Sequence, residues 1–183
     1  MKASKTRKAT SWSDVKARLT HFDHDGLVGL VHDLYTASED NQVFLHARFE
    51  LNEDVLEPYK TPINRWLWPD MFRNQNASVA EAKKSIANYK RAIGRPEGLA
   101  ELMVFYCERA LGFSVEVGLQ DESFFSALVR MFEQALQAIA RLPDAQRPLF
   151  MERLRAVCRI SQNIGYGVED AMRDLLVEYD PYD

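Results

Sequence analysis

Apolar residues recur at alternating steps of three and four along the second half of the chain, from residue 78 to residue 179. The first of five such stripes consists of Val79, Ala82, Ile86, Tyr89 and Ile93. The others span residues 99–117, 125–139, 150–164 and 168–179, and only the fourth includes a polar member. This spacing predicts amphipathic α-helices, because it places each stripe on one helical face.

Residues that start and stop helices lie between the stripes. Ser78 followed by Glu81 predicts a capping box, and Asp121 is a second N-cap candidate. Pro96 suits the first turn of a helix, and Gly118 suits the left-handed geometry that often ends one. The two patterns therefore agree on where the helices begin and end.

The first third of the chain predicts shorter helices. Ser11 with Asp14, Asp23 and Ser38 each open one, and the second carries Leu27, Leu30, Val31, Leu34 and Tyr35 on one face. Short connections predict a helical hairpin here. Residues 52–77 contain three prolines, which predict two short helices followed by a polar loop.

These elements predict an all-α protein of eight or nine helices, arranged as antiparallel hairpins in a bundle or a short solenoid-like stack. We expect residues 1–10, with four basic and no acidic side chains, to form a disordered basic tail. Residues 11–183 are expected to form a single helical domain.

The composition of the chain excludes several classes of function. The chain has 183 residues, 46% of them hydrophobic, and a net charge of −4. It has no apolar run of the ~20 residues that span a bilayer and no signal-peptide pattern, so we expect no membrane partner. Cys107 and Cys158 lack metal-ligand spacing and are interpreted as small core residues, which favours a reduced, cytoplasmic setting. No cofactor is expected.

Several short stretches recur in a characteristic order: 78–84 with Ile86, Tyr89 and Lys90; Pro96-Glu97; Leu102-Met103 with Tyr106; 131–133 with Ala135 and Leu136; and 164–167 with Asp170. Through these stretches the chain resembles, from about residue 55 to residue 179, a bacterial all-helical family of unknown function. The resemblance covers about two thirds of the chain and implies a helical fold and a bacterial origin, but no activity and no site residues.

All four histidines lie between residues 21 and 46, and His21, His24, His32 and Asp33 are candidate metal ligands. His32-Asp33 after an apolar pair resembles the His-Asp step of HD-type metal phosphohydrolases. Such a site needs a histidine from another helix and a distant carboxylate. The alternative interpretation is a polar helix start, with Asp23 as its cap.

Positive charge is concentrated in the middle of the chain. Residues 60–96 contain eight basic and two acidic side chains. The candidates for phosphate contacts are Lys83, Lys84, Lys90, Arg91 and Arg95. The sequence pI of 5.6 argues against dedicated nucleic-acid binding, and the alternative is an ordinary solvated face.

The segment from Trp66 to Phe72 contains five bulky apolar side chains in seven residues. A single short helix cannot bury them all, so Trp66, Trp68, Met71 and Phe72 are candidates for a partner surface. The alternative is that neighbouring helices cover them.

The sequence carries no glycine-rich phosphate loop or nucleophile elbow. We therefore expect a protein-interaction or adaptor module rather than an enzyme, with an unidentified protein as partner. The alternatives are a nucleic-acid-associated protein using residues 60–95 and the tail, and a metal-dependent hydrolase using the histidine cluster.

Overall fold

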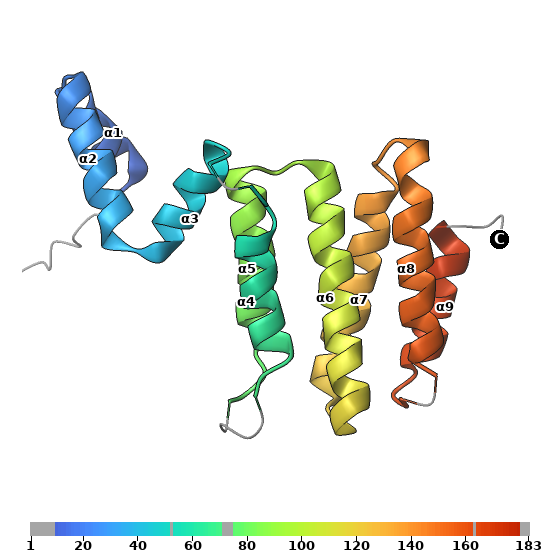
Figure 1. The fold of residues 1–183 in the computed structure, drawn as a ribbon. Helices are drawn as coiled ribbons and strands as arrows, with labels where there is room; N and C mark the ends of the chain where they lie inside the picture. The colour runs from blue at the N-terminus through green and yellow to red at the C-terminus, as the bar shows by residue number, and fades with distance from the viewer. Residues whose placement is uncertain (1–9, 52, 71–74, 163, 180–183) are drawn as a thin grey trace, which may run out of the picture. The chain divides into compact units, whose positions relative to one another are not determined.

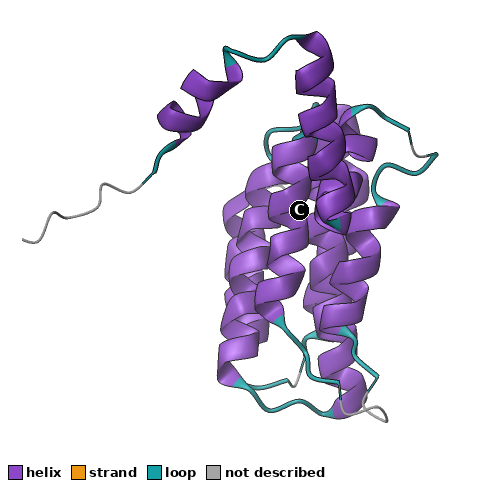
Figure 2. Cartoon of the chain, turned by 90° about the vertical axis from the view of Figure 1, so that its left-hand side faces the viewer, coloured by secondary structure: helices purple, strands orange, loops and turns teal. Residues whose placement is uncertain are grey.

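The computed structural model describes residues 10–51, 53–70, 75–162 and 164–179, so the expected tail at residues 1–9 lies outside the described residues. The prediction of an all-α fold is confirmed. The described residues form nine α-helices and one 3₁₀ helix, with no strand among them (Figure 2). Their bounds are α1 Trp12–Leu19, α2 His24–Ala37, α3 Glu39–Arg48, α4 Glu57–Leu67, α5 Val79–Ala92, α6 Pro96–Val117, α7 Glu122–Ile139, η2 Asp144–Gln146, α8 Arg147–Ile160 and α9 Val168–Tyr179.

The chain divides into two compact units, residues 1–45 and 46–183. The boundary falls inside α3, at a place where the sequence shows no linker composition. The larger unit contains three antiparallel helical hairpins, α4 with α5, α6 with α7, and α8 with α9. Helices α4, α6 and α8 lie side by side in one layer, as Figure 1 shows. Stacked hairpins of this kind bury one shared core between the layers.

The central helix of this unit is α6, which packs against α4, α5, α7 and α8. A helix with neighbours on several sides must be apolar around most of its circumference, and α6 buries ten of its residues. Among the described residues, the largest fully buried side chains are Tyr59, Tyr106, Phe125, Phe132, Ile63, Leu67, Leu102, Leu111, Leu128, Leu136, Ile139 and Leu142.

The predicted helix ends are found close to where the sequence places them. Pro96 opens α6, Gly118 ends it with φ +63°, and Asp121 accepts backbone bonds as the N-cap of α7. Only one of the two hydrogen bonds of the predicted capping box at Ser78 is found. Its hydroxyl accepts from the backbone N–H of Glu81, but its own N–H donates to the Trp66 carbonyl (2.9 Å). That bond ties the start of α5 to the end of α4.

The smaller unit has no core of its own among the described residues. Neither α1 nor α2 buries a residue, and no described residue from 10 to 45 is buried. The close packing implied by the predicted hairpin is therefore not found. Of the apolar face that the sequence assigns to α2, Leu27, Val31 and Leu34 are exposed, whereas Leu30 and Tyr35 are half-buried.

No helix in the described part of the chain is long and apolar enough to cross a membrane.

Tyr59 provides a stability prediction for the larger unit. Its ring packs edge-on against Tyr89 at 5.2 Å, and its buried hydroxyl has no hydrogen-bond partner among the described residues. A buried polar group without a partner costs about 1–3 kcal/mol. Tyr59→Phe is therefore expected to leave the free energy of unfolding unchanged or to raise it by about 1 kcal/mol in urea denaturation. A loss above about 1 kcal/mol would show that the hydroxyl has a partner in solution.

Candidate functional site

Trp68, one of the predicted partner-surface residues, makes three contacts with α6. The Arg109 guanidinium lies 4.0 Å from its ring centroid, and the Phe113 ring packs against it at 6.3 Å. A Cβ on Gly112 would lie 2.7 Å from Trp68 Cζ3, so the indole touches the α6 backbone. Trp68 is half-buried and anchors the end of α4 to α6.

Of the other members of the predicted aromatic surface, Trp66 makes fewer contacts than Trp68. Trp66 is half-buried, and the Arg65 guanidinium lies 5.4 Å from its ring centroid. Met71 and Phe72 lie outside the described residues. A partner surface at Trp66, Trp68, Met71 and Phe72 therefore stays a prediction, with Trp68 already engaged in packing within the larger unit.

Four of the five candidate phosphate contacts lie on α5 and fall on two sides of that helix. Lys83 and Lys90 lie beside the buried stripe, and Lys84 and Arg91 lie on the opposite face, because successive residues turn by about 100°. Lys83 is half-buried, and burial together with the nearby Arg130 lowers its pKa. A single phosphate-contact surface at these residues therefore stays a prediction.

Several cations of the same segment are paired with carboxylates. Arg95 forms an ion pair with Glu50, Lys84 lies 4.0 Å from Glu81, and Lys60 Nζ lies 2.7 Å from Glu101 Oε1. Each pair reduces the charge that could attract a phosphate backbone. The nucleic-acid hypothesis gains no support from this arrangement.

The candidate metal ligands are not brought together. His21, His24, His32 and Asp33 are all exposed, and the three histidines come from the start and middle of α2 or the turn before it. Among the described residues, no group of three or more His, Cys, Asp or Glu side chains could hold a metal ion. Asp23 instead caps α2 by accepting from the Gly26 N–H at 2.8 Å. The polar-helix-start interpretation fits this local geometry.

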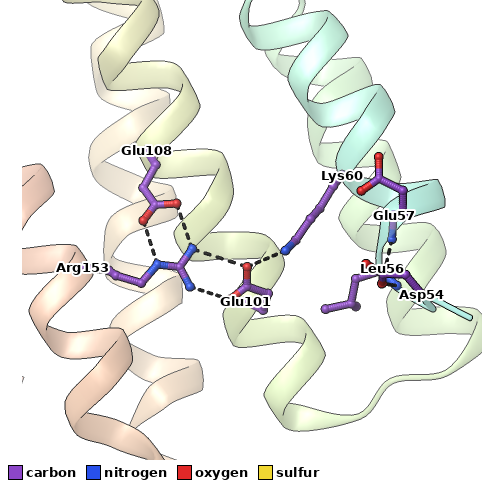
Figure 3. Close-up of polar contacts among 7 residues, drawn as sticks. All are labelled: Asp54, Leu56, Glu57, Lys60, Glu101, Glu108 and Arg153. Carbon is purple, nitrogen blue, oxygen red and sulfur yellow. Dashed lines mark hydrogen bonds and ion pairs between the residues drawn. The ribbon is translucent and has the colours of Figure 1, made fainter.

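A network of four charged side chains crosses the layer of α4, α6 and α8 (Figure 3). Arg153 of α8 donates from Nε and Nη2 to Glu108 at 2.7 and 2.8 Å, and from its Nη atoms to Glu101. Lys60 of α4 reaches the same Glu101. The network therefore links three helices that are distant in sequence.

The network is partly withdrawn from water. Its side chains are 19% exposed at Glu101, 25% at Lys60 and Arg153, and 33% at Glu108. Burial alone would raise the pKa of Glu101, but hydrogen bonds from Arg153 and Lys60 outweigh it and hold that pKa below its ordinary value. The two cations and two carboxylates balance each other, so the network leaves little net charge to bind a ligand.

The remaining candidate is a set of exposed apolar side chains on α2. Leu27, Val28, Val31 and Leu34 are 39%, 54%, 46% and 52% exposed. Trp12, at 68%, adds a large aromatic side chain in the same unit. Contiguous exposed apolar side chains mark surfaces that pack against another molecule or segment. We treat the α2 face as the candidate functional site.

Sequence reasoning found the α2 stripe but not its exposure, and it missed the charged network. The signal for the network is the spacing of Glu101 and Glu108, which are seven residues apart on one face of α6. Their partner Arg153 lies 45 residues or more further along the chain. Only the order of the hairpins brings it to them.

Comparisons with protein-family models, with curated proteins and with solved structures find no match for this chain. The resemblance to a bacterial helical family therefore stays a prediction.

Proposed function

We propose that the protein is a protein–protein interaction module, in which the larger unit is a stable scaffold and the smaller unit supplies the docking face. The observation that carries this proposal is the exposed apolar stripe of α2 in a unit without a buried residue among those described. The sequence supports the same class of function through its lack of recognisable catalytic motifs.

The proposal is supported by the marginal stability of α2 as a helix. Helices shorter than about 12–15 residues are marginal in water, and segments below about 40 residues rarely fold without a partner, a metal or disulfides. With 14 residues, α2 is near that limit, and it contains Gly26 and Gly29. Each glycine costs about 1 kcal/mol relative to alanine inside a helix. Docking of the apolar stripe would supply the missing stabilisation.

We place the protein in a reducing, cytoplasmic setting as part of this proposal. Two thiols support it, since Cys107 and Cys158 are both free and buried. Burial raises the pKa of both thiols, which keeps them protonated and unreactive.

Gly29→Ala is expected to stabilise the helical state of α2 by about 1 kcal/mol, because it removes the glycine penalty. A Cβ at Gly29 would meet nothing within 4 Å, whereas at Gly26 it would lie 2.9 Å from Asp23 Oδ1. Hydrogen exchange of the α2 amides measures the effect, and Gly26→Ala is the matched control with a smaller gain. Faster exchange in Gly29→Ala would contradict the helical geometry of α2.

The proposed function is tested by affinity capture with the tagged full chain in nuclease-treated lysate, read by quantitative mass spectrometry. Leu34→Glu places a charge on the exposed stripe, and Thr36→Glu places the same charge on the opposite side of α2. Proteins captured by the wild type and by Thr36→Glu are expected to be lost with Leu34→Glu. Equal capture by all three chains would contradict a docking role for α2.

A further inference from the structure

We propose that Arg109, held against the ring of Trp68, is a binding site for a carboxylate group. The site lies on the larger unit, where the end of α4 packs against α6, so it does not depend on the α2 face. The carboxylate comes either from a small organic acid or from an Asp or Glu side chain of a docked peptide.

The guanidinium of Arg109 is held in place without using its hydrogen-bond donors. Its Cζ lies 4.0 Å from the Trp68 ring centroid, and that ring is itself fixed by Phe113 and by the α6 backbone at Gly112. A cation–π contact engages the face of a guanidinium, whereas its N–H groups point outward in the guanidinium plane. The donors of Arg109 are therefore free and already positioned, which lowers the entropic cost of binding a ligand.

No described residue supplies the anion with which such a cation usually pairs. Nε of Arg109 is buried and unpartnered, and the side chain makes no hydrogen bond or ion pair within the described part of the chain. The two oxygens of Glu108 accept from Arg153 instead. Burial lowers the pKa of Arg109 by more than the nearby Glu116 and Glu108 raise it. A bound anion would compensate this uncompensated charge.

The chemistry of the site selects a carboxylate. The planar fork of a guanidinium matches the two oxygens of a carboxylate or a phosphate and does not match a spherical ion such as chloride. A single cation balances a single negative charge, and Glu116 nearby disfavours the second charge of a phosphate. Because Nε is buried, we expect the ligand oxygens at the two Nη atoms, which are not among the buried unpartnered atoms of the described residues.

NMR spectra of the nitrogen-15-labelled full chain test the inference, with sodium acetate replacing sodium chloride at constant ionic strength. The guanidinium signals of Arg109, assigned by their loss in Arg109→Lys, are expected to shift with half-saturation at about 10–100 mM acetate. Arg153 is the internal control, because its fork is already occupied by Glu108. Arg109 signals that do not respond, or that move only together with those of Arg153, would overturn the inference.

Two substitutions separate recognition by the fork from simple attraction of charge. Arg109→Lys keeps the charge but not the fork, so binding followed on the Trp68 indole N–H signal is expected to weaken by about threefold or more. Glu116→Gln removes the opposing charge from an exposed position and is expected to tighten binding about twofold, whereas Glu178→Gln on α9 should have no effect. Equal acetate affinity in Arg109→Lys and the wild type would contradict the proposed site.

Three further probes identify the source of the carboxylate. The peptide acetyl-Leu-Asp-Leu-amide is compared with acetate and with its neutral counterpart acetyl-Leu-Asn-Leu-amide. An Asp peptide that binds more tightly than acetate would assign the site to a docked peptide, and equal affinity would assign it to a small organic acid. An Asn peptide that binds as tightly as the Asp peptide, or inorganic phosphate that binds more tightly than acetate, would overturn the assignment to a carboxylate.

Discussion

Gly98→Ala is expected to lower the free energy of unfolding of the larger unit by about 3 kcal/mol, because overpacking a rigid core is strongly destabilising. Gly98 is buried in the first turn of α6. A Cβ there would lie 1.9 Å from Tyr89 Oη and 2.4 Å from Tyr89 Cζ. The ring cannot retreat easily, since Tyr89 is 2% exposed and packs edge-on against Tyr59. Urea denaturation followed by circular dichroism measures the loss.

Two further variants separate the clash from other effects. Alanine gains about 1 kcal/mol of helix propensity over glycine, so the net loss underestimates the strain. Adding Tyr89→Phe removes the nearest atom but leaves the ring carbon, and it should restore only part of the stability. Gly118→Ala meets no atom within 4 Å but requires φ +63°, so about 1 kcal/mol of backbone strain is expected there. A Gly98→Ala protein as stable as the wild type would show that Tyr89 has room to move.

The sequence was sufficient to predict the features that depend on residues close to each other along the chain. The stripe through Ile86 and Tyr89 and the cap at Asp121 are decided within one or two helical turns, and the structure confirms both. The same holds for Gly118, whose left-handed φ matches its prediction as a helix end. Local periodicity therefore fixed the helices and the all-α class.

Features that depend on the stacking of hairpins could not be predicted in this way. The need for glycine at position 98 comes from Tyr89 on another helix, and the ion pairs of Glu101 come from α4 and α8. Whether Lys83 and Lys84 contribute to one surface also depends on the neighbouring helices, because adjacent residues on a helix point in different directions. The exposure of the α2 stripe could not be predicted either, because a sequence shows which face of a helix is apolar but not what covers that face.

Arg153→Met is expected to destabilise the protein by about 2 kcal/mol at neutral pH. The substitution keeps most of the apolar stem of the side chain but leaves Glu101 and Glu108 without their shared guanidinium. Removing one partner of a fully buried pair costs about 3–5 kcal/mol, and the exposure of 19–33% in this network reduces that figure. The matched control is Arg173→Met on α9, whose exposed ion pairs with Glu169 and Asp170 should contribute less than about 1 kcal/mol.

The pH dependence of stability distinguishes lost electrostatics from lost packing at Arg153. The pKa of Glu101 is lowered in the folded protein, so the folded state binds its proton less readily than the unfolded state does. This contribution is complete above the unfolded carboxyl pKa of about 4.3 and is lost as the pH falls through the lower folded value. The stability difference between wild type and Arg153→Met, from urea midpoints, should therefore shrink between pH 6 and about pH 3. A difference that stays constant over that range would assign the role of Arg153 to packing of its aliphatic stem.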